Sequence, residues 1–142
     1  KEMFIKKEIA LFPCADRQVI EFIADFKFRC GDENVEVIEK LFTSGYCWYF
    51  AHMLQQAFGR GKVCYAYFEG HFVWLDGTSE KEDFAYDIYG VNKNWEHLIP
   101  EELIGDGILD FKHVRGNQSN MEEQDIIKLL LNIIDKKQFA YS

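Results

Sequence analysis

The sequence predicts an α+β protein, with helices before and after a small antiparallel sheet. Helical apolar periodicity dominates residues 16–58, β-rich runs separated by turn residues occupy 63–89, and an amphipathic helical pattern returns near the end of the chain. The 142 residues fit one domain with an ordinary hydrophobic core. Because no repeat, low-complexity tract or linker divides the sequence, we expect a single domain over residues 1–142.

Two helices are expected first. Asp16 can cap a helix that runs to about Phe28 and ends at Cys30-Gly31, and Asp32 can cap a second, shorter helix that Thr43-Ser44-Gly45 terminates. Their apolar positions recur every three to four residues: Val19, Ile20, Ile23 and Ala24, then Val35, Ile38, Leu41 and Phe42.

The next helix is expected to begin at Cys47 and to form the core of the domain. Its apolar positions fit one helical stripe: Cys47, Phe50, Ala51, Leu54, Ala57 and Phe58. Gly59-Arg60-Gly61 closes this helix, since glycine supplies the backbone freedom that a helix terminus uses.

Three β-rich runs then follow: Val63–Phe68, His71–Leu75 and Phe84–Tyr89. Glu69-Gly70 and the polar stretch 76–83 separate them, as in an antiparallel meander. Side chains alternate between the two faces of a strand, so we expect His71 on the face of Val73 and Asp87 on the face of Ala85.

Three more elements are expected towards the end of the chain. Pro100–Ile104 is typical of a single helical turn, Ile108–Val114 of a last strand, and Met121–Lys137 of an amphipathic helix that covers the domain. The apolar residues of that helix are Ile126, Ile127, Leu130, Ile133 and Ile134.

Composition excludes several classes of protein. Hydrophobic residues make up 48% of the chain and aromatic residues 16%, too many for a disordered chain, while the apolar runs are too short to span a bilayer. A net charge of −8 argues against binding to a phosphate backbone. We therefore expect a soluble protein that binds neither nucleic acid nor membrane.

The four cysteines are almost evenly spaced, at Cys14, Cys30, Cys47 and Cys64, with no CxxC pair and no zinc-finger spacing. We expect reduced thiols and no bound metal or cofactor, with all but Cys47 packed as small hydrophobes. No signal segment opens the sequence, so a cytoplasmic location is expected, although a chain that begins with Lys1 need not contain its native N-terminus.

Cys47, His71 and Asp87 supply the three side-chain types of a thiol triad on three successive elements. A cysteine at a helix N-terminus lies beside unpaired backbone N–H groups that favour its thiolate, and its own N–H can serve as an oxyanion donor. The three side chains converge if the two strands are neighbours and the helix packs across their ends.

Other histidines fit the base less well. His52 falls on the Cys47 helix away from its apolar face, where it is solvent-facing or a local hydrogen-bond partner. Neither His97 nor His113 follows a glycine on an apolar strand next to that helix.

Each of the three triad residues, taken alone, has a common structural role, as a packed cysteine, a strand histidine or a capping aspartate. The alternative function is a non-catalytic protein-binding or inhibitor module, which includes an acidic mimic of nucleic acid. Its contact surface would be aromatic, formed by Trp48, Tyr49, Trp74, Tyr86, Tyr89 and Trp95.

Three short motifs lie in order within residues 35–92. Gly45-Tyr46-Cys47 precedes a helix, His71-Phe72-Val73-Trp74 lies in a strand, and Tyr86-Asp87-Ile88-Tyr89-Gly90 lies in the next strand. Together they resemble the core of the transglutaminase-like branch of the papain-like cysteine-enzyme superfamily. The resemblance implies a papain-like fold, with the nucleophile helix packed on an antiparallel sheet.

The resemblance also implies roles: Cys47 as nucleophile, His71 as general base and acid, and Asp87 as the group that orients the imidazole. The implied activity is acyl transfer at amide bonds of a peptide or protein substrate, by a peptidase, deamidase or transglutaminase-like hydrolase. Papain-like proteases carry an oxyanion-hole glutamine shortly before the cysteine. Here the only upstream glutamine is Gln18, so this role is not assigned.

Overall fold

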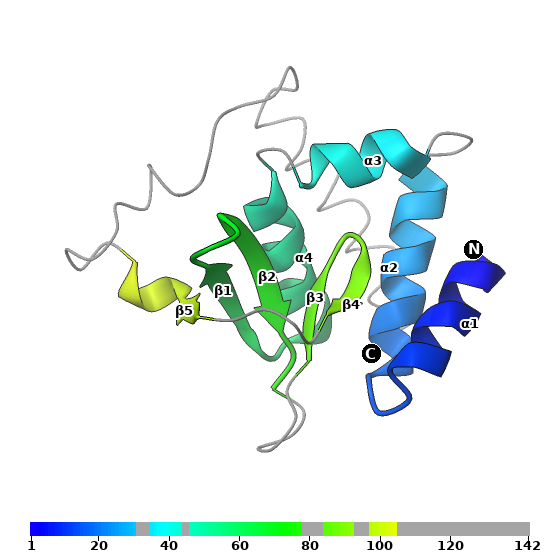
Figure 1. Cartoon of the computed structure of the whole chain (residues 1–142), viewed down its shortest axis with the longest axis horizontal. Helices are drawn as coiled ribbons and strands as arrows, with labels where there is room; N and C mark the ends of the chain where they lie inside the picture. The colour runs from blue at the N-terminus through cyan, green and yellow to red at the C-terminus, as the bar shows by residue number, and fades with distance from the viewer. Residues whose placement is uncertain (31–34, 44–45, 78–83, 93–96, 105–142) are drawn as a thin grey trace.

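The computed structural model describes residues 1–30, 35–43, 46–77, 84–92 and 97–104, and in these ranges the chain forms four α-helices, a five-stranded sheet and one 3₁₀ turn (Figure 1). The helices are α1 (Glu2–Leu11), α2 (Arg17–Cys30), α3 (Val35–Leu41) and α4 (Cys47–Phe58). The strands are β1 (Lys62–Ala66), β2 (His71–Leu75), β3 (Ala85–Asp87), β4 (Gly90–Asn92) and β5 (Leu98–Pro100), followed by the turn η1 (Glu101–Leu103).

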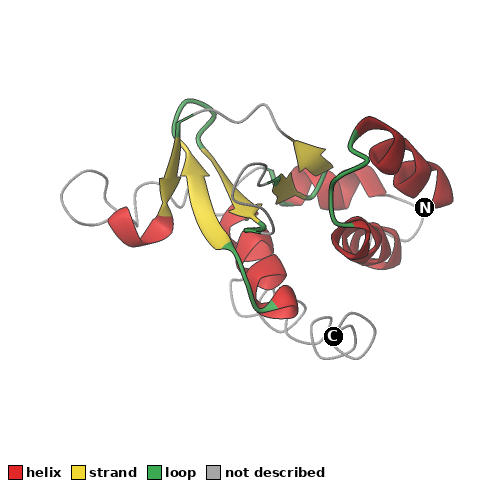
Figure 2. Cartoon of the chain, turned by 90° about the horizontal axis from the view of Figure 1, so that it is seen from below, coloured by secondary structure: helices red, strands yellow, loops and turns green. Residues whose placement is uncertain are grey.

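The sheet has the strand order β4-β3-β2-β1-β5, and every neighbouring pair is antiparallel. Helix α4 packs along one face of this sheet, while α1 and α2 stand beside its β4 edge (Figures 1 and 2). The predicted α+β class and the predicted antiparallel meander are therefore confirmed.

Alternation along the strands divides the apolar side chains between two clusters. Phe72, Trp74 and Tyr86 belong to the main core together with α4, whereas Val73 and Ala85 belong to a smaller cluster with Cys64. This grouping is the one that strand periodicity predicts.

Aromatic rings hold the helices to each other within the main core. Phe26 of α2 lies 5.2 Å from Phe50 of α4 and 5.5 Å from Phe42, measured between ring centroids, and Phe42 and Phe50 lie 5.6 Å apart. All three side chains are almost completely buried. Because this cluster joins α2, α4 and the end of α3, it fixes the position of the N-terminus of α4.

Two predicted helix boundaries are confirmed by their capping groups. The Asp16 carboxylate accepts a hydrogen bond from the Gln18 N–H (2.8 Å), which caps α2. Helix α4 begins at Cys47, and Gly59 ends it with a φ of 65°, in the left-handed region that favours glycine.

Three elements were not predicted: α1, β4 and β5. The N-cap of α1, Lys1, makes no side-chain capping bond, and this helix buries Glu8 beside Ile5, which breaks the apolar pattern. The two strands have three residues each, so pairing with their neighbours, rather than local propensity, determines them.

The predicted strand boundaries differ slightly from those observed. β1 ends at Ala66 because residues 67–70 form the turn into β2, and β3 ends at Asp87 because residues 88–89 form a hairpin turn. The predicted helical turn is present as η1. The cap at Asp32, the strand Ile108–Val114 and the helix Met121–Lys137 lie outside the described residues. No helix in the described ranges is long and apolar enough to cross a membrane.

The main core predicts a contrast between two leucines in the same kind of element. Leu54 of α4 is completely buried, whereas Leu11 at the end of α1 is 59% exposed. Leu54→Ala should lower the free energy of unfolding by roughly 2–5 kcal/mol, because it leaves a cavity. Leu11→Ala, the matched control, should change it by less than about 0.5 kcal/mol. Urea denaturation measures both, and equal losses would contradict the assignment of α4 to the core.

Candidate active site

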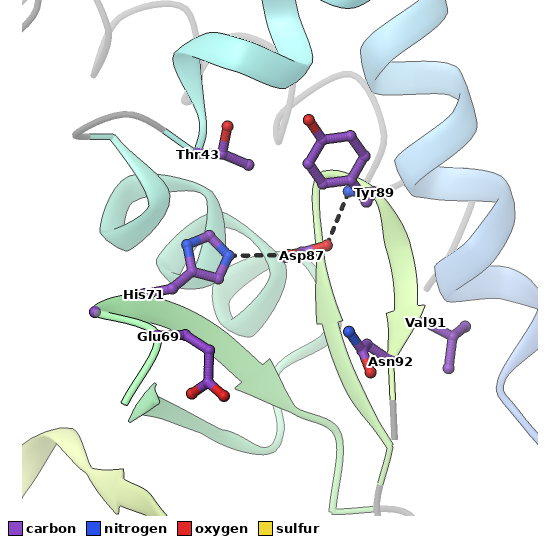
Figure 3. A pocket seen from close by; sticks show the side chains of 8 residues that line it. Thr43, Glu69, His71, Asp87, Tyr89, Val91 and Asn92 are labelled. Carbon is purple, nitrogen blue, oxygen red and sulfur yellow. Dashed lines mark hydrogen bonds and ion pairs between the residues drawn. The ribbon is translucent and has the colours of Figure 1, made fainter. Parts of the chain in front are cut away.

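The structure places the three predicted site residues at the ends of three elements. Cys47 is the first residue of α4, His71 the first of β2 and Asp87 the last of β3. The Nε2 atom of His71 lies 2.9 Å from Oδ2 of Asp87, and both residues are buried (Figure 3). The Cys47 side chain is close enough to His71 to raise the pKa of the imidazole. The imidazole is therefore hydrogen-bonded to the carboxylate and influenced by the thiol.

The Cys47 sulfur also contacts the backbone of β2. The Phe72 N–H donates a hydrogen bond to Sγ at a distance of 3.4 Å. Strands β2 and β3 pair only at Trp74 with Tyr86 and at Leu75 with Ala85, so their paired register stops before His71 and Asp87. Beyond that register, the thiol and the His71 ring connect α4 to the two strands.

The Asp87 carboxylate is held on its other side by its own hairpin. Oδ1 accepts a hydrogen bond from the Tyr89 N–H (2.8 Å), two residues along the chain (Figure 3). This is the side-chain-to-backbone bond of an Asx turn. Because Oδ1 and Oδ2 are bound in different directions, the plane of the carboxylate facing His71 is fixed.

Buried charged side chains of the N-terminal helices form hydrogen bonds with the β3–β4 hairpin. Lys27 of α2 is 3% exposed, and its Nζ donates to the Ile88 carbonyl oxygen (3.1 Å) and to Oε2 of Glu39 (3.0 Å). The ammonium also lies 4.1 Å from the centroid of the Phe4 ring. The turn that carries Asp87 is thereby tied to α1, α2 and α3.

Glu8 of α1 provides a second attachment. Its Oε1 accepts a hydrogen bond from the Val91 N–H at 2.8 Å. Burial raises the pKa of Glu8, although the bond from Val91 and the charge of Lys27 oppose this shift. Gly90 has a φ of 113°, and a Cβ there would collide with the Glu8 carboxylate, so the close approach of α1 requires glycine.

The electrostatics of His71 are dominated by its two partners. Burial by itself lowers the pKa of the imidazole, but the hydrogen bonds to Asp87 and Cys47 and the negative charges of both groups raise it to about 9. The protonated imidazole is therefore the favoured form at neutral pH, with an anionic or hydrogen-bonding group on each side.

A cleft of about 400 Å³ opens beside the His71–Asp87 pair. It is lined by residues of the β1–β2 turn and the β3–β4 hairpin and by Thr43, two residues after the end of α3 (Figure 3). Cys47 is 7% exposed and is not among the described residues that line the cleft.

Comparison of the chain with protein-family models, with curated proteins and with solved structures gave no match. The interpretation of the site therefore depends on its own geometry. In the described ranges, no three His, Cys, Asp or Glu side chains come together in a group that could hold a metal ion.

The other candidate histidines lie elsewhere. His52 is hydrogen-bonded to Glu101 (2.8 Å), which also accepts a bond from the Trp48 indole (2.9 Å). His52 was expected to be solvent-facing or a local hydrogen-bond partner. It does form a hydrogen bond, but its partner lies 49 positions away in the sequence. His97 packs edge-on against the Phe68 ring with a φ of 53°. His113 lies outside the described residues.

The remaining cysteines only partly follow the prediction. Cys14, Cys47 and Cys64 are free thiols, and Cys64 is buried as predicted. Burial raises the pKa of Cys64 to about 11. Cys14 is exposed, so its predicted packing as a small hydrophobe was wrong, because it lies in the connection between α1 and α2. The side chain of Cys30 lies outside the description.

Sequence reasoning missed three groups that support the site: the Phe72 N–H, Lys27 and Glu8. A backbone N–H has no sequence signal. The two charged residues did have a sequence signal. Lys27 lies on the apolar face of its helix, and Glu8 interrupts the apolar face of α1. Charged residues at such positions are almost never fully buried unless they are paired.

The ion pair between buried Lys27 and partly buried Glu39 predicts a measurable loss of stability when it is removed. Lys27→Met keeps the length of the side chain but leaves Glu39 and the Ile88 carbonyl without their donor, and should lower the free energy of unfolding by about 3 kcal/mol. Arg17→Met breaks the exposed pair with Glu21 on the same helix and should cost less than about 0.5 kcal/mol. Guanidinium denaturation compares the two variants, and similar losses would show that Lys27 does not fasten the hairpin.

The raised pKa of His71 predicts a pH dependence of stability. Protonation of His71 stabilises the folded state fully below pH 6.5, its ordinary pKa, and this contribution is lost as pH rises towards 9. The unfolding free energy of the wild type, minus that of His71→Gln, should therefore decrease across this interval. The His71 ring resonance in NMR should titrate near pH 9, and at lower pH in Asp87→Asn. A midpoint near 6.5 in both proteins would disprove the coupling.

Proposed function

We propose that this chain is a cysteine-dependent enzyme that transfers acyl groups from amide bonds, with Cys47, His71 and Asp87 as its triad. The observation that carries the proposal is the position of the His71 ring, whose Nε2 is hydrogen-bonded to Asp87 and whose pKa is raised by the neighbouring Cys47 side chain. A nucleophile beside a base that a third group orients is the arrangement that such chemistry requires.

In the proposed reaction the Cys47 thiolate attacks the carbonyl carbon of an amide, and a C–S bond forms. Two backbone groups favour the negatively charged species of this step. The Phe72 N–H donates to the sulfur that becomes the thiolate, and the Cys47 N–H at the start of α4 can donate to the developing oxyanion. The side chain of Tyr46 makes no capping bond at this helix terminus.

Collapse of the tetrahedral intermediate breaks the C–N bond, and protonated His71 gives its proton to the departing amine. Water then attacks the resulting thioester while neutral His71 accepts a proton. The C–S bond breaks, the carboxylic acid is released, and His71 returns its proton to regenerate the Cys47 thiol. Asp87 holds Nε2 of the ring in every step, which leaves Nδ1 to exchange the proton. A second amine in place of water would give transfer instead of hydrolysis.

The proposal extends to the fold. We assign the arrangement of α4 on the antiparallel sheet to the papain-like type, in its transglutaminase-like form. This assignment is supported by the chain order of nucleophile helix, histidine strand and aspartate strand, and by a cysteine as the first residue of the helix.

A second candidate function, a protein-binding module, is favoured by one surface feature. Tyr67 and Phe68, in the β1–β2 turn, are 50% and 69% exposed. The aromatic surface expected from the sequence is different. Tyr49, Trp74 and Tyr86 are buried, Trp48 is partly buried, Tyr89 is exposed and Trp95 lies outside the described residues. A binding module needs no reactive thiol, so the chemistry of Cys47 separates the two functions.

The test is acylation by p-nitrophenyl acetate, a small ester that needs no specific substrate. The wild type should release nitrophenolate in a burst of about one equivalent and then turn over slowly, with the acetyl group on Cys47 in peptide mass spectra. Cys47→Ser should abolish the burst with little change in melting temperature. Asp87→Asn should slow it by roughly tenfold or more, because the imidazole loses its orienting partner.

Cys64→Ser and Cys14→Ser are the matched controls. Cys64 is another buried thiol and Cys14 is an exposed one, and neither lies beside a described histidine. Both variants should keep the full burst. If the acetyl group were found on Cys14 alone, or if Cys47→Ser acted like the wild type, the enzyme proposal would fail and the binding module would replace it.

A further inference from the structure

The charges that line the cleft beside His71 are unevenly distributed. Its described lining contains two carboxylates, Glu69 and Asp87, and neither lysine nor arginine. Both oxygens of Asp87 are bound, one to His71 and one to the Tyr89 N–H. Glu69 is exposed, and within the described ranges its carboxylate makes no hydrogen bond or ion pair.

Glu69 is held close to the triad by the backbone. It lies in the four-residue turn between β1 and β2, two residues before His71, and this turn is closed by the Gly70 N–H, which donates to the Ala66 carbonyl oxygen (2.9 Å). In Figure 3 the Glu69 side chain lies on one side of the His71–Asp87 pair, and Tyr89 lies on the other.

We propose that Glu69 forms a subsite for a positively charged side chain of the substrate, a lysine or an arginine next to the reacting amide. This inference rests on the proposed acyl-transfer function. The carboxylate would pair with the cationic group, and the 53% exposed Tyr89 ring across the cleft offers an apolar surface to the methylene stem.

The described cationic groups near the cleft are paired with other residues, so they do not neutralise the negative charge of Glu69. Lys27 lies 5.9 Å from the centroid of the Tyr89 ring, but it is buried and paired with Glu39. The proton on His71 is balanced by the carboxylate of Asp87, 2.9 Å away. A cationic side chain therefore enters a cleft with a net negative charge, which favours it over a neutral or acidic one.

The first experiment measures the charge preference without a known substrate. Cationic trimethylammonium-ethyl and anionic sulfonato-ethyl methanethiosulfonates modify thiols by the same chemistry, and peptide mass spectrometry gives the rate at Cys47 for each. The cationic reagent should react faster, and Glu69→Gln should reduce the ratio of the two rates by about three- to tenfold at low salt, with a smaller change in high salt. Glu102→Gln, another exposed acid, should leave the ratio unchanged.

The second experiment uses acyl-lysine and acyl-norleucine aminomethylcoumarin amides, which differ only in the ammonium group of the acyl residue. The wild type should prefer lysine in kcat/KM, and Glu69→Gln should remove most of this preference while it leaves the p-nitrophenyl acetate burst intact. A normal burst with an unchanged reagent ratio and no preference for lysine would overturn the subsite and leave the enzyme proposal standing. Loss of the burst in the wild type, with the reagent ratio still dependent on Glu69, would overturn the enzyme proposal and leave a cation-binding cleft.

Discussion

The hydrogen bond between His71 and Asp87 is the interaction around which the rest of the structure is arranged. It spans the place where β2 and β3 no longer pair, and it joins a residue that opens one strand to a residue that closes the next. In a regular sheet, backbone hydrogen bonds would hold the two strands together at this point. Here the strands are held by side chains instead, and the sulfur of Cys47 receives the backbone N–H of Phe72. A titratable pair, rather than the sheet ladder, thus closes this end of the sheet.

Because a side-chain hydrogen bond holds this end of the sheet, the β3–β4 hairpin that carries Asp87 needs support from the surrounding chain. A hairpin of two three-residue strands is marginal by itself, because so few contacts offset its loss of conformational entropy. Glu8 and Lys27 supply this support with buried hydrogen bonds to the backbone of the hairpin on either side of Gly90. Buried ionic groups contribute little net stability compared with apolar residues of similar size, but they require a definite geometry. The N-terminal helices are therefore best understood as the frame that orients Asp87, and their cost in desolvation is the consequence of that role.

The sequence was informative where local patterns decide the structure. The boundaries of α4, the cap of α2 and the alternation along β2 and β3 follow from periodicity and terminal residues, and so do the positions of Cys47 and His71 as first residues of their elements. Asp87 was expected inside a strand that runs to Tyr89, whereas it is the last residue of β3. It was uninformative where pairing between distant residues decides. β4 and β5 form because they pair with the free edges of β3 and β1. Helix α1 packs against the sheet through Glu8, a buried charged residue that does not fit its amphipathic pattern. Cys14 was predicted to be packed because its neighbours in the sequence are apolar. It is exposed, because it lies in the turn between two helices.

The two buried cysteines among the described side chains provide the most direct argument about what the site is for. Cys64 lies among Val73 and Ala85, its thiol is 3.9 Å from the Lys62 carbonyl oxygen, and burial together with nearby carboxylates raises its pKa, so its surroundings favour the neutral thiol. Cys47 is buried to a similar extent, yet it receives a backbone N–H and contacts an imidazole whose pKa is raised. A cysteine that served only to fill space would not need hydrogen-bond donors, and desolvating those donors has a cost that an apolar contact avoids. The difference between the two environments therefore supports a chemical rather than a packing role for Cys47.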